Sequence, residues 1–145
     1  MKPSIFLADD DDDDCVLFQD AMNEVARDHE LVIAYDGQEL LETLDARVPP
    51  EPRAIFIDLN MPRKNGIECL QEIKTIDKLK NIPVIILSTS SQSGSIETAY
   101  ANGADLYITK PGTYAMLKKT IEIVLSIDWK TSRPFPFDQF FLSIS

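Results

Sequence analysis

Short apolar runs separated by longer mixed stretches make up most of the chain. The runs fall at residues 5–8, 31–34, 54–57, 84–87 and 106–108, and they are apolar at every position instead of at alternate positions. Such runs are typical of strands in a parallel sheet that is covered by helices on both faces. We therefore predict five buried strands.

The stretches between these runs have helical periodicity. Apolar residues recur there at intervals of three and four, as the buried face of an amphipathic helix requires. They are Leu17, Ala21 and Val25, then Ile67, Leu70 and Ile73, then Leu117, Ile121 and Val124. Asp36-Gly37 and Asn65-Gly66 have the composition of turns that open helices. Alternating strands and helices predict an α/β fold.

Length and composition limit the number of domains and the classes of function to be considered. A chain of 145 residues is enough for one core and too short for two. The net charge is −10 with no Lys/Arg cluster, so direct nucleic-acid binding is not expected. The apolar run near the start is too short for a signal peptide or a membrane span, which favours a cytoplasmic protein with no membrane contact. Cys15 and Cys69 lack the spacing of a metal site or a disulfide framework.

Polar residues follow four of the predicted strands. Aspartates 9–11 follow the first strand, Asp58 the third, Ser88 the fourth and Lys110 the fifth. Ligands of an open parallel sheet bind at the carboxyl ends of its strands. We therefore expect carboxylates, a hydroxyl group and an ammonium group to converge at one edge.

The chemistry of these residues suits phosphoryl transfer. Mg²⁺ prefers oxygen ligands, and Asp10, Asp58 and the carbonyl group of Asn60 would supply them. Asp58 stands alone at its strand end, where its carboxylate could act as a nucleophile and form an aspartyl phosphate. Lys110 and Ser88 would then contact the phosphoryl oxygens, because this reaction depends mainly on positioning and electrostatics.

The six consecutive aspartates divide into groups. Asp9 and Asp10 directly follow a buried strand, so we assign them to the site, with Asp11 as an accessory. Residues 12–14 instead fit the first turn of a helix, where acidic side chains cap the backbone and match its positive end.

Four motifs, in this order, resemble the receiver domain of bacterial two-component response regulators, and among these the single-domain regulators of chemotaxis. They are residues 5–11, residues 58–62 with Gly66, Ser88, and residues 107–111. The resemblance covers roughly residues 3–127. It implies a flavodoxin-like (βα)5 fold with a five-stranded parallel sheet, strand order 2-1-3-4-5, and helices on both faces. It also implies a phosphorelay role, with phosphotransfer from a histidine kinase or a histidine phosphotransfer protein.

The resemblance implies roles for particular residues. The Mg²⁺ ligands would be Asp9, Asp10, Asp58 and Asn60. The catalytic residues would be Asp58 as the phosphoacceptor, Ser88 and Lys110, and the switch residues would be Ser88 and Tyr107. The Lys110–Pro111 bond resembles one that is cis in the family. Such a chain would be no enzyme beyond its own phosphorylation and dephosphorylation, and a downstream protein that the sequence does not identify would read the switch.

Two other functions stay open. A small Mg²⁺-dependent phosphatase would also use a strand-end aspartate such as Asp58, but it needs a second aspartate at the position of Asn60 to act as a general acid. The second alternative is an adaptor whose binding does not depend on phosphorylation.

The last residues depart from the pattern. We divide the chain into a receiver domain at residues 1–127 and an aromatic-rich extension at residues 128–145, which holds Trp129 and four of the seven phenylalanines. Aromatic side chains carry a large apolar area that must be covered. The first hypothesis is that this tail folds back over its own domain. The second is that it docks on a second copy, which would form a homodimer, or on a target.

Overall fold

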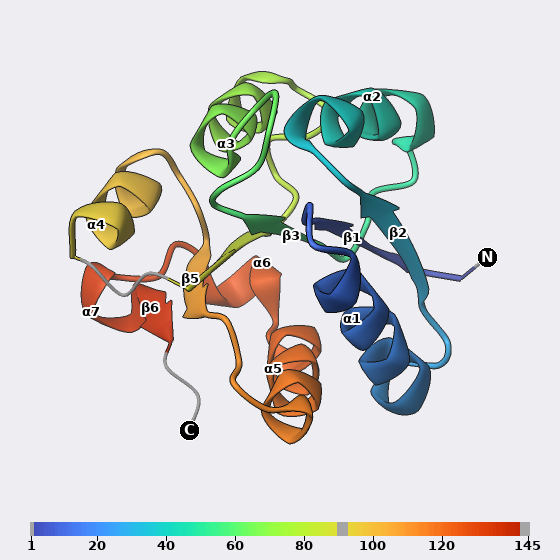
Figure 1. Ribbon diagram of the computed structural model, residues 1–145. Helices are drawn as coiled ribbons and strands as arrows, with labels where there is room; N and C mark the ends of the chain where they lie inside the picture. Colours follow the sequence, from blue (N-terminus) through green and yellow to red (C-terminus); the bar gives the residue numbers. More distant parts are fainter. Residues whose placement is uncertain (1, 90–92, 143–145) are drawn as a thin grey trace.

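The computed structural model describes residues 2–89 and 93–142 and has one parallel sheet between two layers of helices (Figure 1). The strands are β1 (Ser4–Ala8), β2 (Glu30–Ala34), β3 (Ala54–Asp58), β4 (Val84–Ser88), β5 (Leu106–Thr109) and β6 (Phe141–Leu142). The helices are α1 (Asp12–Val25), α2 (Gly37–Arg47), α3 (Gly66–Thr75), α4 (Ser93–Ala101), α5 (Tyr114–Ser126), α6 (Trp129–Ser132) and α7 (Phe137–Phe140).

The sheet has the order β2-β1-β3-β4-β5-β6, and all of its neighbouring strands are parallel. The predicted order of the first five strands is therefore confirmed. The expectation of only five strands was incomplete, because the tail adds β6 beside β5, with Phe141 opposite Tyr107. A strand of two residues is too short to leave a periodic pattern in the sequence.

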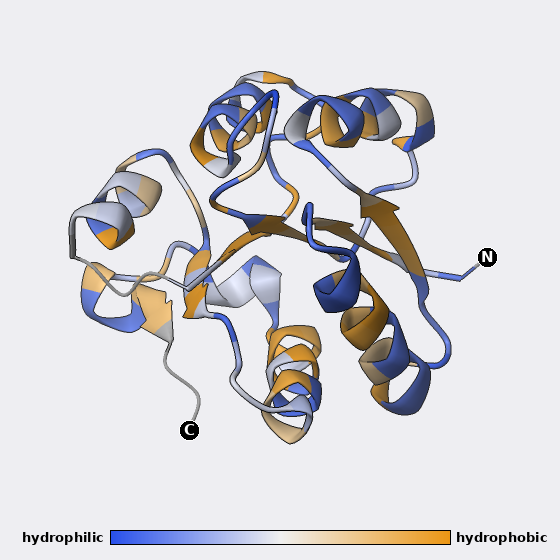
Figure 2. Ribbon diagram, viewed as in Figure 1, coloured by the Kyte–Doolittle hydropathy of each residue, from blue (hydrophilic) through white to orange (hydrophobic). Residues whose placement is uncertain are grey.

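Both faces of the sheet are buried, which explains the continuous apolar runs. In β1, Ile5 and Leu7 pack with residues of α1 and α5, whereas Phe6 and Ala8 pack with residues of α2, α3 and α4. Successive side chains of a strand point to opposite faces, so a strand covered on both sides must be apolar throughout. Figure 2 shows the resulting hydrophobic sheet between helices with one polar side.

Capping residues set where the helices begin. The Asp36 side chain accepts a hydrogen bond from the backbone of Glu39 at the start of α2. Asn65 and Glu68 form a capping box at the start of α3. Both predicted turns are thus confirmed. Gly66 also permits a close approach, because a Cβ atom there would lie 2.7 Å from the carbonyl oxygen of Asp58.

The predicted buried face of α1 was partly wrong. The helix buries Cys15, Phe18, Ala21 and Met22, whereas Leu17 is 45% exposed. The orientation is set by Phe18, whose ring meets that of Phe56 in β3 edge to face at 5.2 Å. Such aromatic pairs add to the energy of burial, so this contact fixes which stripe of α1 faces the sheet.

The described part of the tail, residues 128–142, folds back over the sheet edge at β5 (Figure 1). Trp129 and Phe135 lie 5.9 Å apart and pack on the same side as α1 and α5. Phe140 is fully buried on the opposite side. An ion pair of 2.8 Å between Arg133 and Asp105 ties the tail to the start of β5. The first hypothesis for the tail is confirmed for these residues.

Membrane insertion was not expected from the sequence. Among the residues that the structure describes, none of the helices combines the length and the apolar character needed to cross a bilayer.

Candidate functional site

Four strands end at one edge of the sheet with the residues that the sequence singled out. Asp9 follows β1, Asp58 ends β3, Ser88 ends β4 and Lys110 follows β5. The Lys110 backbone N–H donates to the Ser88 carbonyl oxygen at 2.8 Å, which holds the ends of β4 and β5 together. The parallel topology therefore brings these residues to a common edge, as the sequence predicted.

Three carboxylates form the acidic part of this edge. Asp9, Asp10 and Asp58 each offer an oxygen atom, and these atoms all lie within 4.8 Å of one another. Asp9 and Asp58 are buried, whereas Asp10 is exposed. A set of oxygen atoms with one solvent-facing member suits a hard divalent cation that keeps some of its water ligands.

The electrostatic environment of the Asp9 carboxylate also favours a nearby cation. Burial raises the pKa of Asp9 to about 6, although the N–H group of Asp11 and the ammonium group of Lys110 act in the opposite direction. The nearby charge of Asp58 raises this pKa further. Ionisation of Asp9 is therefore costly unless a positive charge lies beside it.

Lys110 supplies positive charge at the same edge. Its Nζ atom lies 2.9 Å from Oδ2 of Asp14, 3.1 Å from Oδ2 of Asp9 and 3.3 Å from Oδ2 of Asp58. Burial would lower the pKa of Lys110, but the hydrogen bond to Asp14 and the charges of Asp58 and Asp9 outweigh it and raise the pKa above its ordinary value. The ammonium group thus stays charged and is held against the acidic cluster.

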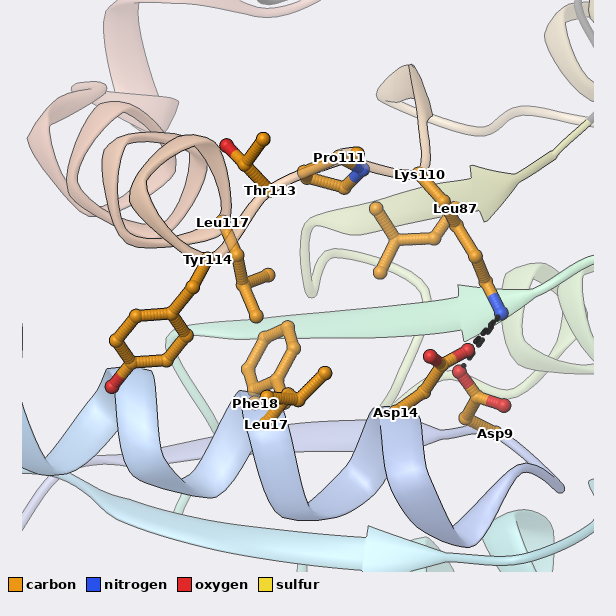
Figure 3. Close-up of a pocket in the computed structure, with 11 residues that line it drawn as sticks. Asp9, Asp14, Leu17, Phe18, Leu87, Lys110, Pro111, Thr113, Tyr114 and Leu117 are labelled. Carbon is orange, nitrogen blue, oxygen red and sulfur yellow. Dashed lines mark hydrogen bonds and ion pairs between the residues drawn. The ribbon is translucent and has the colours of Figure 1, made fainter.

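Asp14 is a member of this network that the sequence did not identify. The sequence predicts that residues 12–14 cap and charge-match the first turn of α1. They do form its acidic first turn, but the capping side chain is that of Asp11, which accepts a hydrogen bond from the Asp14 backbone at 3.1 Å. The Asp14 carboxylate points to Lys110 (Figure 3). Asp14 precedes the buried Phe18 by one helical turn, and this spacing is the signal that could have revealed it.

The peptide bond after Lys110 differs from the one that the resemblance suggested. In the described residues the cis peptide bonds are Val48–Pro49, Pro49–Pro50 and Arg133–Pro134. Lys110–Pro111 is therefore trans, and the lysine reaches the carboxylates in that form.

Asn60 and Ser88 flank Asp58. The backbone N–H of Asn60 donates to Oδ1 of Asp58 at 3.3 Å, so the loop after β3 folds beside the carboxylate. Ser88 is fully buried at the end of the neighbouring strand. Both residues lie at the edge where the sequence predicted them.

Tyr107 lies within β5, before the strand reaches this edge of the sheet, and is fully buried. Its ring lies 6.4 Å from that of Phe140 and 5.9 Å from that of Phe141, so the tail covers it. The sequence predicted Tyr107 as a switch residue, but it gave no sign that the tail packs on this side chain.

A hollow of about 130 Å³ opens between α1 and α5 beside the ammonium group (Figure 3). Asp9, Asp14 and Lys110 form its polar end, and Leu17 and Leu117 contribute to its apolar wall. The charged groups therefore border open space on the side of α1.

Comparison with known proteins identifies relatives of this chain. Residues 5–122 match the response regulator receiver domain. The response regulator Rcp1 of Synechocystis sp. is 34% identical over 122 residues, which are 81% of this chain and 83% of Rcp1. The solved structure of the phosphorylated cyanobacterial phytochrome response regulator RcpA has a TM-score of 0.76 at 35% identity, over 91% of this chain and 96% of RcpA. The Mn²⁺-bound form of Rcp1 has a TM-score of 0.75 at 33% identity, over 89% of this chain and 96% of that one.

Proposed function

The chain belongs to the response regulator receiver domain family, and from this membership we propose that it accepts a phosphoryl group on Asp58 and transmits the change through protein contacts. The similar regulators Rcp1 and RcpA are matched over most of their own length. This coverage supports a role as a stand-alone receiver. Output through a partner protein is then the mode of signalling that we propose.

One observation carries the proposal. The carboxylate of Asp58 ends β3 within 3.3 Å of the Lys110 ammonium group and within the same cluster as Asp9 and Asp10. A nucleophilic oxygen, a fixed positive charge and a set of cation ligands are the three parts that phosphoryl transfer needs. This convergence supports Asp58 as the acceptor.

The cation that we propose is Mg²⁺. Asp9, Asp10, Asp58 and the Asn60 carbonyl group would hold it. The existence of a Mn²⁺-bound form of the similar regulator Rcp1 supports a divalent cation. Mg²⁺ prefers sites with only oxygen ligands. When bound, the cation would neutralise part of the charge on the phosphoryl oxygens.

The transfer step itself needs no separate base. An oxygen of the Asp58 carboxylate attacks the phosphorus atom of a phosphohistidine, a P–O bond forms, and the donor P–N bond breaks. The bonding electrons stay on the imidazole nitrogen of the donor, which takes a proton from solvent. Lys110 and the hydroxyl group of Ser88 would stabilise the charge on the phosphoryl oxygens during this step.

The donor that we propose is a histidine kinase or a histidine phosphotransfer protein. The surface of α1 supports a protein donor, because Val16 is 60% exposed and Leu17 is 45% exposed there. Leu17 also lines the hollow beside Lys110. Exposed apolar side chains next to a reactive group are suited to contact with a partner.

The output would begin at Ser88 and Tyr107. A phosphoryl group adds up to about two negative charges, and it would draw Ser88 toward its oxygens and leave room for Tyr107 to change position. Because the rings of Phe140 and Phe141 pack on Tyr107, such a change would also loosen the tail. The region around α4, β5 and the tail would then be the surface that partners read.

The function is tested by labelling with a small phosphodonor such as acetyl phosphate. With Mg²⁺ present, the intact mass should rise by one phosphoryl group, whereas Asp58→Asn and a sample with a chelator should stay unmodified. Labelling of Asp58→Asn to the same extent would contradict the assignment of Asp58.

The alternatives have different outcomes. Repeated turnover of a phosphoester by the unmodified protein, lost in Asp58→Asn, would favour a small phosphatase. Partner binding that is equal for the labelled, unlabelled and Asp58→Asn proteins would favour an adaptor that does not depend on phosphorylation.

A further inference from the structure

Carboxylate groups accept hydrogen bonds from all three donors of the Lys110 ammonium group. An ammonium group carries three N–H donors, and Nζ lies within hydrogen-bond distance of Asp14 at 2.9 Å, Asp9 at 3.1 Å and Asp58 at 3.3 Å. All three donors are therefore directed at carboxylates. Phosphorylation converts the Asp58 carboxylate to an acyl phosphate, which removes the carboxylate charge and so releases one of these donors. Any further contact of the ammonium group with the phosphoryl oxygens requires that the hydrogen bond to Asp9 or to Asp14 be given up.

The hydrogen bond to Asp14 is the one that can be released most easily. The Asp9 and Asp58 side chains are 3% and 11% exposed and belong to the acidic cluster, whereas that of Asp14 is 41% exposed. Water can solvate an exposed carboxylate once its partner leaves, so exposed ion pairs are weak. Asp14 also borders the hollow between α1 and α5, which gives its side chain room to move.

We propose that Asp14 is a positioning residue that holds Lys110 in the unphosphorylated protein and competes with the phosphoryl group for its ammonium group. This inference rests on the proposed function. Phosphorylation would exchange the Asp14 contact of Lys110 for a contact with a phosphoryl oxygen. Asp14 thereby lowers the stability of the phosphorylated state relative to the unmodified state. It does so through Lys110 and not through the acceptor or the cation ligands.

A general charge effect has to be separated from this competition. Asp13 carries the same charge in the same first turn of α1 and is exposed. Among the residues that the structure describes, the ion-pair partners of Lys110 are Asp9, Asp14 and Asp58. Asp13→Asn therefore removes one negative charge near the site and leaves the competing hydrogen bond intact, which makes it the matched control for Asp14→Asn.

The test uses fluoroberyllate, which binds a carboxylate and takes the place of a phosphoryl group. Its dissociation constant is measured by titration at saturating Mg²⁺ for the wild type, Asp14→Asn and Asp13→Asn. Asp14→Asn should bind about two- to five-fold more tightly than Asp13→Asn, which is the range expected for an exposed ion pair. Asp14→Glu, which restores a carboxylate, should return the constant toward that of the wild type.

A second set of variants lacks the Lys110 ammonium group, for which Asp14 and the phosphoryl group compete. In a Lys110→Met background the constants of the Asp14→Asn and Asp13→Asn variants should be equal, because a double-mutant cycle isolates the contact between two residues. In proteins that keep Lys110, equal dissociation constants for Asp14→Asn and Asp13→Asn, or weaker binding by Asp14→Asn, would overturn the role of Asp14. Absence of binding to the wild type would instead overturn the proposed function.

Discussion

The ring of Phe140 in α7 lies 6.4 Å from the ring of Tyr107 in β5, and both side chains are fully buried. The ring of Tyr100 in α4 also meets Phe140 at 5.0 Å. A residue of the tail thus completes the core between the sheet and α4. The described part of the tail, residues 128–142, packs on the folded domain and lies against the residue that the proposed switch would move.

The first prediction concerns the energy of this contact. Phe140→Ala should lower the free energy of unfolding by about 3–5 kcal/mol, because it removes a large buried ring and leaves a cavity. Phe137→Ala, in the same helix but 45% exposed, should cost about 1 kcal/mol. Urea unfolding of the two variants measures the difference.

Truncation after Ile127 extends this test to the whole tail. It should lower the melting temperature of the monomer, because Phe140, Trp129 and Phe135 all lose their contacts. An unchanged melting temperature together with an equal cost for both phenylalanine variants would show that the tail does not cover the sheet edge in solution.

The second prediction concerns the close approach at Gly66. A Cβ atom at this position would lie 2.7 Å from the carbonyl oxygen of Asp58 and 2.9 Å from the Cα atom of Leu59, and both are backbone atoms. Gly66→Ala should therefore destabilise the protein by about 1–3 kcal/mol, as overpacking does.

Gly94→Ala is the matched control, because Gly94 also lies in the first turn of a helix and, among residues 2–89 and 93–142, none lies within 4 Å of the added Cβ atom. This substitution should stabilise the protein by up to about 1 kcal/mol, because alanine has less freedom in the unfolded chain. Thermal unfolding distinguishes the two, and a neutral or stabilising Gly66→Ala would contradict the close packing of α3 on the Asp58 strand.

The third prediction concerns pH. Burial raises the pKa of Asp9 from 3.8 to about 6 in the folded protein. The stability that Asp9 contributes is therefore fully present below about pH 4 and is lost as the pH rises to about 6. The shift corresponds to about 3 kcal/mol, at about 1.4 kcal/mol for each pKa unit.

Urea unfolding in a chelating buffer at several pH values tests this prediction. Relative to Asp9→Asn, which cannot ionise there, the wild type should lose stability between about pH 4 and about pH 6 and then level off. Added Mg²⁺ should restore the stability of the wild type at the upper end, since a bound cation favours the ionised carboxylate. Parallel pH profiles for the two proteins would show that Asp9 is not perturbed by burial.

Much of the fold could be predicted from the sequence, for a physical reason. Strands such as β3 and β4 are buried on both faces, so every position must be apolar and the runs are easy to recognise. The same topology carries the strand ends to one edge, which explains why Asp9, Asp58 and Lys110 could be expected to meet before their distances were known.

Other features depend on contacts that no local pattern encodes. β6 has two residues, and it pairs with β5 because Phe140 and Phe141 pack beside Tyr107. The local pattern explains Asp14 as an acidic residue in the first turn of α1, and only the tertiary fold brings Lys110 within 2.9 Å of its carboxylate. Both errors arise where tertiary packing selects among local alternatives.

The identity of the residue that carries the phosphoryl group tests the account most directly. After labelling with acetyl phosphate and Mg²⁺, reduction with borohydride converts a phosphorylated aspartate to homoserine, and peptide mass spectrometry locates it. The account predicts homoserine at position 58 alone and none in Asp58→Asn. Homoserine at another aspartate of the wild type, with position 58 unmodified, would contradict it.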